Sequence, residues 1–243
     1  MLTDRDMERY DRQILLDHIG RKGQEKLKKA RVAIVGAGGL GTAASLYLAA
    51  AGIGKMTIID CQVPELSNLN RQVLHWEEDV AMTNKAESIK EKLSSLNSDI
   101  QIEAITEKIT TENIDVLKDA TIIVDCLDNF STRYSLNEFC VKNQKPLVHA
   151  AVEGFYGQLT TIIPSKTPCL KCIFPKMTDK EIFPIIGVTT GLFGALEANE
   201  VIKLITDAGE VLAGKLLFYD LLSNSFDIIE IKKNEKCEVC ANI

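Results

Sequence analysis

The sequence lacks any apolar run long enough to cross a membrane. The longest one near the start, "SLYLAAAGIG" (45–54), lies inside a helical pattern, whereas a spanning helix needs about 20 apolar residues. The first thirty residues are rich in charge and contain no apolar core of the kind found in secretory signals. We therefore expect a cytoplasmic protein with no membrane partner.

Blocks of lysine or arginine are missing as well. The chain has 28 basic and 34 acidic residues, which gives a formal net charge of −6. Proteins that bind nucleic acids or anionic membranes usually carry clusters of positive charge. We therefore expect no nucleic-acid partner.

The sequence also lacks linkers, repeats and low-complexity segments. With 243 residues, of which 46% are apolar, the chain is long enough to bury a sizeable core. No stretch rich in proline, glycine or serine marks a boundary, so we predict one continuous domain over residues 1–243.

Short apolar runs alternate with helical patterns between residues 31 and 150, after a charged helical arm at 1–30. We predict strands at 31–36, 55–60, 100–105, 121–129 and 146–151, and helices at 40–52, 84–97, 113–120 and 131–143. Gly52 is a typical helix C-terminal stop, and either Ser131 or Thr132 is a suitable N-cap. The alternation predicts an α/β fold, with a Rossmann-like, mostly parallel sheet and helices on both faces.

The pattern changes after residue 150. A strand at 157–164 runs into "CLKC", and a long helix follows at 187–205. Two further strands, at 215–220 and 226–231, flank the turn sequence "LLSNS". They predict an antiparallel C-terminal hairpin.

The stretch "RVAIVGAGGLG" (31–41) predicts a strand that enters a nucleotide-binding turn. Its glycines are Gly36, Gly38, Gly39 and Gly41. The first permits a tight turn, Gly38 lets a phosphate approach the backbone, and Gly41 lets the helix pack against the strand. Asp60 ends the second strand 24 residues after Gly36, where an acid binds ribose hydroxyls.

These features fit NAD as well as ATP, and the next segment separates the two. "SNLNRQ" (67–72) supplies Asn68, Asn70, Arg71 and Gln72, and Lys85 opens the following helix. Either cation alone would be an ordinary surface charge. Two cations and several amides together, placed beyond the ribose site, suit the three phosphates of ATP. An enzyme that transfers hydride from NAD would instead require an apolar pocket for the nicotinamide ring there.

The fourth strand ends in "DCLDN" (125–129). Ligands bind at the carboxyl ends of parallel strands, and a carboxylate beside a triphosphate suits a bound Mg²⁺. We assign this role to Asp128, with Asn129 beside it, and expect Asp125 to cap the next helix.

Two C-x-x-C pairs predict a zinc site. The pairs are Cys169 with Cys172 and Cys237 with Cys240. Four thiolates fill the tetrahedral coordination of Zn²⁺ and leave no open position, so we expect a structural site that ties the C-terminal tail to the middle of the chain. Free thiols or two redox pairs are the alternatives. The other cysteines are Cys126 and Cys140, expected in the core, and Cys61, which borders the nucleotide site.

The glycine turn, "SNLNRQ", "DCLDN" and the paired C-x-x-C motifs together resemble the MoeB/ThiF/HesA family, relatives of the ubiquitin-activating enzymes. The resemblance extends from "RYDRQILL" to "CEVC". It implies Mg-ATP-dependent adenylation of the C-terminal glycine carboxylate of a small ubiquitin-fold carrier ending in Gly-Gly, similar to MoaD or ThiS, with release of pyrophosphate. We accordingly divide the single adenylation domain into a helical arm (1–30), a nucleotide-binding half (31–150) and a zinc-bearing, carrier-binding half (151–243).

The resemblance also implies roles for individual residues. Asp60 corresponds to the ribose-binding acid, Arg71 and Lys85 to the phosphate-binding cations, and Asp128 to the aspartate that supports Mg²⁺ and catalysis. Arg12, in "RYDRQ", corresponds to an arginine inserted into the partner subunit's ATP site, which implies a homodimer. "DNFSTR" also matches the family and contains Arg133, for which we expect a structural role.

The sequence departs from the family pattern at two places. Gln62 stands where the family often has an aspartate, and the segment 173–191 contains no cysteine to accept a carrier as a thioester or acyl persulfide. We therefore expect the reaction to stop at adenylation. The alternatives are adenylation of a peptide, a small molecule or a tRNA base, an NAD-dependent oxidoreductase, and a scaffold without turnover.

The predicted reaction needs no catalytic histidine. An α-carboxyl group, with a pKa of about 3.3–3.7, is already ionised at neutral pH and attacks the α-phosphorus without a general base. The obstacle is the repulsion between two anions, which cations relieve. His18, His75 and His149 are accordingly expected to be ordinary residues.

Overall fold

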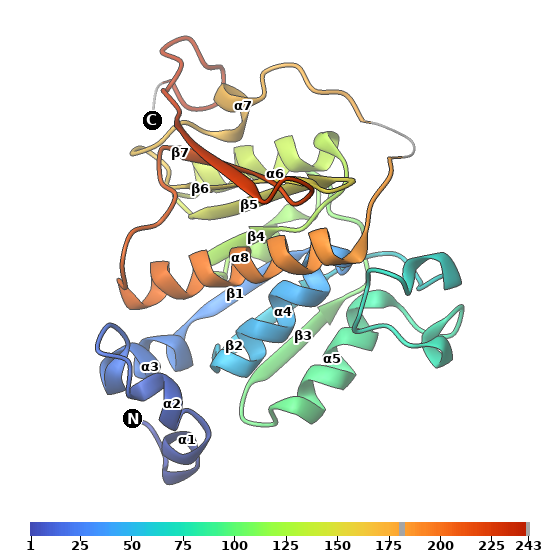
Figure 1. Ribbon diagram of the computed structural model, residues 1–243, viewed down its shortest axis with the longest axis vertical. Helices are drawn as coiled ribbons and strands as arrows, with labels where there is room; N and C mark the ends of the chain where they lie inside the picture. Colours follow the sequence, from blue (N-terminus) through green and yellow to red (C-terminus); the bar gives the residue numbers. More distant parts are fainter. Residues whose placement is uncertain (180–182, 242–243) are drawn as a thin grey trace.

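An eight-stranded sheet forms the centre of the computed structural model, which describes residues 1–179 and 183–241 (Figure 1). The strand order is β3-β2-β1-β4-β5-β6-β7-β8. The strands are β1 (Arg31–Val35), β2 (Lys55–Ile59), β3 (Gln101–Ile105), β4 (Ile122–Asp125), β5 (Leu147–Glu153), β6 (Tyr156–Ile162), β7 (Lys215–Asp220) and β8 (Ser225–Glu230). All strands predicted from the sequence are present, with boundaries that differ by a few residues.

The first five strands, β1 to β5, pair with one another in parallel. Their central members are almost wholly apolar and buried, as strands covered on both faces must be. β1 lies between β2 and β4, so the chain leaves β1 toward one side of the sheet and returns to its other side. This reversal creates a crevice at the carboxyl ends of β1 and β4, where open α/β sheets bind ligands.

The last four strands pair in antiparallel fashion. β5 turns directly into β6 through Gly154, whose φ of +59° suits glycine. β7 and β8 form the predicted C-terminal hairpin, with Asp220 opposite Ser225. β8 is one of the two edge strands, and every one of its residues is exposed.

Helices cover both faces of the sheet, as predicted (Figure 1). The helices are α1 (Asp4–Arg9), α2 (Asp11–Ile14), α3 (Gly20–Lys29), α4 (Gly39–Ala51), α5 (Lys85–Leu96), α6 (Phe130–Lys142), α7 (Leu170–Ile173) and α8 (Gly187–Thr206). One core cluster joins α3, α4, α5 and α8 to the sheet, and a second joins α6 and α7 to its other face. Among the described residues, none of the helices is long and apolar enough to span a bilayer.

Local signals set several helix boundaries. Gly52 ends α4 in the left-handed region at φ +86°, as predicted. The helical arm consists of the three short helices α1–α3, and the helix expected at 113–120 is a 3₁₀ turn, η3 (Ile114–Leu117). The segment 61–80, between β2 and α5, contains two further 3₁₀ turns, η1 (Leu66–Asn68) and η2 (Glu77–Asp79).

The predicted N-cap of α6 is wrong. The cap is Asn129, whose Oδ1 accepts a hydrogen bond of 3.0 Å from the Thr132 amide. Ser131 and Thr132 already lie within the first helical turn. The extended backbone of Asn129 (φ −133°, ψ 141°) places its side chain under the free N–H groups, which is the geometry a cap requires.

Candidate active site

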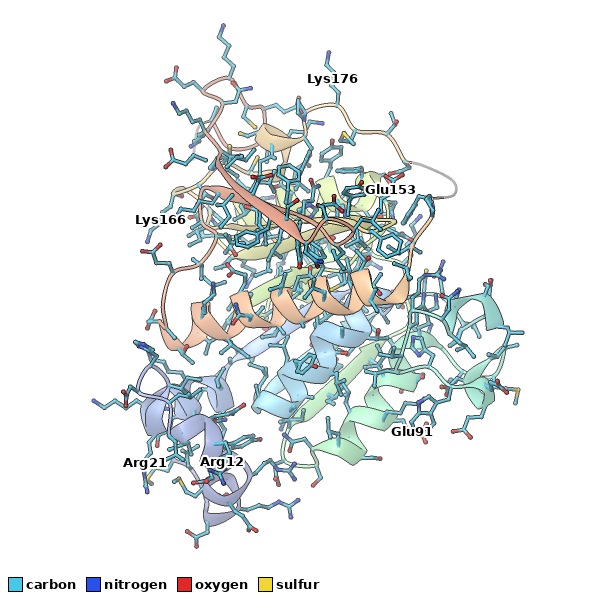
Figure 2. All side chains as sticks on the ribbon, viewed as in Figure 1. Arg12, Arg21, Glu91, Glu153, Lys166 and Lys176 are labelled. Atoms are coloured by element: carbon cyan, nitrogen blue, oxygen red, sulfur yellow. The ribbon has the colours of Figure 1, made fainter. Side chains whose placement is uncertain are left out.

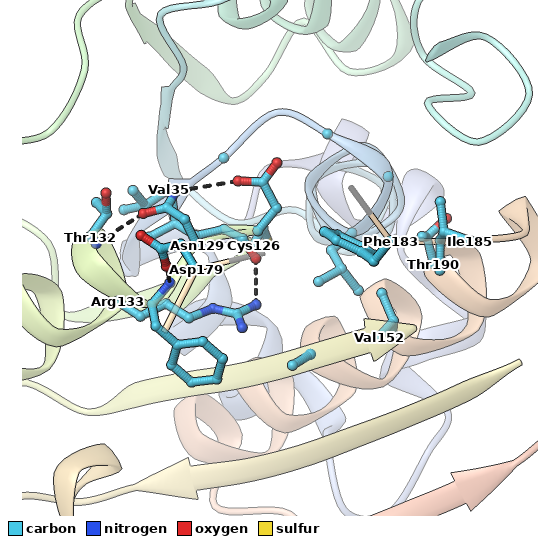
Figure 3. Close-up of a pocket in the computed structure, with 18 of the residues that line it drawn as sticks. Val35, Cys126, Asn129, Thr132, Arg133, Val152, Asp179, Phe183, Ile185 and Thr190 are labelled. Atoms are coloured by element: carbon cyan, nitrogen blue, oxygen red, sulfur yellow. Dashed lines mark hydrogen bonds between the residues drawn. The ribbon is translucent and has the colours of Figure 1, made fainter. Parts of the chain in front are cut away.

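A cavity of about 830 Å³ lies at the carboxyl ends of β1, β2 and β4 (Figure 3). Of the thirteen residues predicted to bind the nucleotide or to act in catalysis, nine line it: Gly36, Gly38, Gly39, Asp60, Arg71, Gln72, Lys85, Asp128 and Asn129. Gly41, Asn68, Asn70 and Arg12 do not line it. The fold thus gathers residues from five separate segments of the chain around one crevice.

The glycine turn owes its shape to close backbone contacts. Gly36 has a φ of +103°, and a Cβ there would lie 2.4 Å from the Cys126 carbonyl oxygen. A Cβ on Gly41 would lie 1.9 Å from the Gly36 oxygen, so Gly41 allows α4 to pack closely against the turn, as predicted. The first N–H groups of α4 have no intrahelical partners and, with the helix dipole, favour a bound anion.

Asp60 and Lys85 flank the turn. The Asp60 carboxylate accepts hydrogen bonds of 2.8 Å from the amides of Ala37 and Gln62. Asn84 caps α5 and also donates to the Asp60 carbonyl, which fixes the start of α5 beside the end of β2. Lys85, the first residue of α5, is therefore held at the wall of the cavity.

Lys85 is a buried cation with an amide partner. Its side chain is 4% exposed in the folded chain, and Nζ donates a 2.8 Å hydrogen bond to Gln62 Oε1. Burial lowers the pKa of Lys85, while the carboxylates of Asp60 and Asp128 oppose that effect. Gln62, the departure from the family pattern, thus positions Lys85 without neutralising its charge.

In the "SNLNRQ" segment, some residues make local hydrogen bonds and others line the cavity. Asn68 is buried, and its Oδ1 accepts from the Glu65 amide at the start of η1. Asn70 Oδ1 accepts from Arg71 Nη1, which also donates to the Ser67 carbonyl. Gln72 lies beside Gly38, and its buried Oε1 has no hydrogen-bond partner. An orphaned buried acceptor beside a glycine turn fits a site that takes a polar ligand.

Asp128 and Asn129 form the opposite wall. Asp128 is exposed to the cavity, and its Oδ1 accepts a 3.2 Å hydrogen bond from Asn129 Nδ2. The Asp128 carboxylate faces the same space as Lys85 and Arg71. Cations together with the exposed carboxylate of Asp128 fit a nucleotide phosphate chain with Mg²⁺, which takes one or two carboxylates and several phosphate or water oxygens.

Asp125 does not cap α6, and this prediction is also wrong. It is fully buried, and its Oδ2 lies 2.7 Å from His149 Nδ1. Arg133 lies 3.5 Å from Oδ1 and donates hydrogen bonds to the carbonyls of Leu127 and Ala150. Burial raises the pKa of Asp125, but the Arg133 guanidinium and the His149 hydrogen bond outweigh it, so the net pKa is lowered.

This buried network was only partly visible in the sequence. Arg133 has the expected structural role, yet it also lines the cavity (Figure 3). Burial lowers the pKa of His149, so His149 is a neutral donor to Asp125. Asp125 and His149 sit opposite each other on β4 and β5, a register that the linear sequence does not display.

Cys126 and Cys140 are buried, as expected, and Cys61 is exposed at the cavity. Cys126 Sγ donates to Glu197 Oε2 at 3.4 Å. Glu197, on α8, is a buried acid whose pKa is raised well above its ordinary value by burial. Burial therefore favours the neutral form of this acid, and no sequence motif marked it.

The segment after α7 contributes to the mouth of the cavity. Phe174, Met177, Asp179, Phe183 and Ile185 all line it (Figure 3). Asp179 Oδ1 accepts from the Phe130 and Ser131 amides at the start of α6. Part of the cysteine-free segment, residues 180–182, lies outside the described residues.

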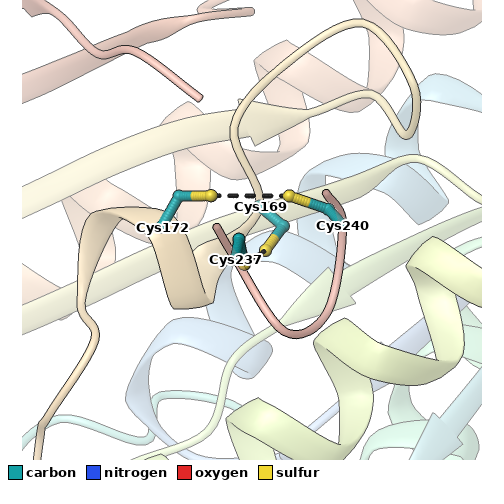
Figure 4. Close-up of side chains that lie close together, drawn as sticks. All are labelled: Cys169, Cys172, Cys237 and Cys240. Atoms are coloured by element: carbon teal, nitrogen blue, oxygen red, sulfur yellow. Dashed lines mark hydrogen bonds between the residues drawn. The ribbon is translucent and has the colours of Figure 1, made fainter. Parts of the chain in front are cut away.

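The four cysteines of the two C-x-x-C pairs come together (Figure 4). All their Sγ atoms lie within 4.8 Å of one another. The Cys169–Cys237 and Cys172–Cys240 sulfur distances are 3.7 and 3.4 Å, close to the ~3.8 Å edge of a tetrahedron with Zn–S bonds of about 2.3 Å. The cluster can hold one metal ion and joins the C-terminal tail to α7.

Arg12 lies on α2, within the N-terminal helical arm (Figure 2). Its side chain is 93% exposed, with Asp11 at 3.8 Å as its ion-pair partner. Arg12 is therefore not part of the cavity of its own chain.

Comparison with known proteins identifies the family. The model of the ThiF family matches residues 10–239. The chain belongs to the ThiF family. A SAMP-activating enzyme E1 of Haloferax volcanii is 41% identical over 241 residues, which cover 96% of this chain and 88% of that protein.

Two further relatives and one solved structure support this assignment. A sulfur carrier protein adenylyltransferase of Thermus thermophilus is 38% identical over 252 residues, covering 99% of this chain and 93% of that protein. The adenylyltransferase and sulfurtransferase MOCS3 of Anopheles gambiae is 43% identical over 248 residues, but the chain spans only 56% of it. The crystal structure of E. coli MccB with ATP matches with a TM-score of 0.83 and 29% identity, over 96% of this chain and 74% of that one.

These matches place the chain among the adenylyltransferases of the ThiF family. The resemblance drawn from its motifs is thereby confirmed, as is the mixed sheet with its antiparallel hairpin.

Proposed function

We propose that this chain uses Mg-ATP to adenylate the C-terminal glycine carboxylate of a small ubiquitin-fold sulfur carrier, with release of pyrophosphate. The observation that carries the proposal is the cavity itself, where the glycine turn and Asp60 face Arg71, Lys85 and Asp128. A nucleotide is the ligand that needs a ribose-binding acid, a phosphate-binding turn and cations in this order. The names of the Haloferax and Thermus relatives support a protein carrier as the second substrate.

The residues of the cavity suit this chemistry without a general base. Asp60 binds the ribose hydroxyls, and the start of α4 faces the phosphates. Arg71 and Lys85 stabilise the charge that grows on the leaving pyrophosphate, and Asp128 holds the Mg²⁺. The carrier carboxylate enters already ionised and attacks the α-phosphorus.

The carrier is expected to dock on an apolar surface beside the cavity. Tyr156 and Phe218 line the cavity and are both exposed, and Ile229 of β8, on the same face of the sheet as Phe218, is 46% exposed. A ubiquitin-fold protein seated there can pass its flexible Gly-Gly end into the cavity. This surface belongs to the zinc-bearing half, where we place carrier binding.

The active species is proposed to be a homodimer in which Arg12 acts in the partner subunit's cavity. Its exposure, together with that of Leu15 and Leu16 on the same arm, leaves an apolar and basic surface available for a second copy. Zn²⁺ at the four cysteines is proposed to be structural. Since the sequence between 173 and 191 has no cysteine, a separate protein would carry out sulfur transfer.

ATP–pyrophosphate exchange tests the proposal. The purified protein is incubated with labelled pyrophosphate, Mg-ATP and a panel of ubiquitin-fold proteins ending in Gly-Gly. Exchange that depends on one carrier, and is lost when its terminal glycine is removed, supports the proposal. The absence of exchange with every carrier would redirect it to a peptide or small-molecule substrate, and preferential binding of NAD over ATP would contradict it.

A further inference from the structure

Hydrogen bonds to Asp60 and His75 hold the two peptide units that flank Ala37 in the glycine turn. The Ala37 amide donates to Asp60 Oδ2 at 2.8 Å, and the Ala37 carbonyl oxygen lies 2.9 Å from His75 Nε2. Ala37 and His75 are 0% and 3% exposed. Both polar groups of Ala37 therefore have defined partners, one of which lines the cavity and one of which does not.

The two contacts of the His75 ring fix its tautomer. A carbonyl oxygen only accepts hydrogen bonds, so Nε2 carries the proton and donates to Ala37. The other nitrogen, Nδ1, lies 2.9 Å from Ser88 Oγ and accepts from its hydroxyl. Burial lowers the pKa of His75, which favours this neutral form.

Ser88 is itself held in place by a buried ion pair. Lys92 Nζ donates to Ser88 Oγ at 2.9 Å and pairs with Asp79 at 2.5 Å. Lys92 occupies an acceptor position of the hydroxyl, and of the two acceptors around the Ser88 proton, His75 Nδ1 at 2.9 Å is nearer than the Leu74 carbonyl oxygen at 3.5 Å. Ser88 lies one turn after Lys85 on α5, so His75 ties the glycine turn to the helix that bears the buried cation.

Trans peptide geometry gives this bond a consequence for ligand binding. The Ala37 carbonyl and the Gly38 N–H belong to one planar peptide unit and point in opposite directions. With the carbonyl directed at His75 in the protein interior, the Gly38 N–H is directed away from it. Gly38 lines the cavity and His75 does not, so the amide faces the ligand side.

We propose that His75 is a positioning residue that orients the Ala37–Gly38 peptide so that the Gly38 amide binds a nucleotide phosphate. This inference rests on the proposed use of ATP and deepens it. If His75 were an ordinary residue, as its sequence context led us to expect, its replacement would cost stability alone. The positioning role predicts a selective loss for ligands that carry phosphates.

The test compares ATP with adenosine by calorimetric titration, without any carrier protein. His75→Leu removes the donor and fills the site with an apolar side chain. We expect ATP to bind about tenfold more weakly, the equivalent of one hydrogen bond of about 1.4 kcal/mol, while adenosine affinity stays within about twofold. His75→Gln, whose amide nitrogen can replace Nε2 as donor, should recover most of the ATP affinity.

The exposed His18→Gln is the matched control and should bind both ligands as the wild type does. Equal ATP affinity in His75→Leu and the wild type would overturn the proposal. So would an equal loss for ATP and adenosine, or no recovery in His75→Gln. Since the readout is nucleotide binding, failure of carrier-dependent exchange would count against adenylation and leave this comparison intact.

Discussion

Single residues in the cavity differ in how much protein surrounds them. Lys85 is buried, and its ammonium group donates a hydrogen bond to Gln62. The Asp128 side chain is exposed to the cavity, and among the described residues its hydrogen-bond partner is Asn129. A buried cation preserves the shape of the site before a ligand arrives. An exposed carboxylate is free to coordinate an incoming ion. Substitution of Asp128 should therefore affect the chemistry more than the fold.

Asp128→Asn should reduce ATP–pyrophosphate exchange by about 100-fold or more, because an amide holds Mg²⁺ far less well than a carboxylate. The melting temperature should stay within a few degrees of the wild type. Exchange rates measured across a Mg²⁺ titration would check this. Asp119→Asn, on an exposed loop, is the charge-matched control. A normal rate at low Mg²⁺ would remove Asp128 from the metal site.

Patterns within one element were sufficient for much of the fold. The apolar runs of β1 and β4, the glycine that ends α4 and the C-terminal hairpin follow from local sequence. The missed features depend on register between elements. His149 meets Asp125 because β4 and β5 pair in parallel, and Glu197 meets Cys126 because α8 crosses the sheet. Both partners in each contact are ordinary residues in their own segment, so no periodicity marks them.

The first helix gives a prediction about acid stability. Asp6 accepts from Thr3 in a capping box and pairs with Lys28 of α3. Burial raises its pKa, but the Lys28 and Thr3 contacts outweigh it and lower the pKa from 3.8 to about 2. A lowered folded-state pKa stabilises the protein above the unfolded value, and that contribution is lost as the pH falls toward 2.

Asp6→Asn should therefore lower the free energy of unfolding by about 1–2 kcal/mol at pH 7. The difference from the wild type should shrink below pH 4 and be mostly lost by pH 2, the pKa of Asp6 in the folded protein. Urea unfolding at a series of pH values would measure it, with the exposed Asp17→Asn as control. A difference that stays constant down to pH 2 would show that the charge of Asp6 is not its source.

The cysteine cluster joins α7 to the C-terminal tail, so its metal should stabilise both. Cys240→Ser should lower the zinc content, which we expect to be one ion per chain in the wild type. It should also reduce the melting temperature by several degrees, which corresponds to a loss of about 1–2 kcal/mol in the free energy of unfolding for a chain of this size. Metal analysis and calorimetry would check this. Cys61→Ser, outside the cluster, should change neither quantity. Full stability in metal-free Cys240→Ser would contradict a structural zinc site.

At the scale of the whole molecule, one proposed catalytic group lies away from the cavity of its own chain. Arg12 is on the helical arm, and the cavity is at the carboxyl ends of the central strands. An arginine supplied to a phosphoryl-transfer site is worth roughly 10³–10⁵ in rate. If Arg12 has this role, a second copy must deliver it, and catalysis would depend on dimer formation.

Arg12→Ala should then retain ATP binding and lose nearly all exchange activity. Asp128→Asn should also lose nearly all exchange activity. Mixing the two inactive variants provides a sharp test. In a symmetric dimer each mixed pair contains one cavity with an intact Asp128 and an Arg12 from its neighbour. After subunit exchange at equal concentrations, half of the dimers are mixed, so activity should return to about a quarter of the wild-type value. If Arg12 acts within its own chain, the mixture should stay as inactive as its two components. If Arg12 has no role in catalysis, Arg12→Ala should be active by itself.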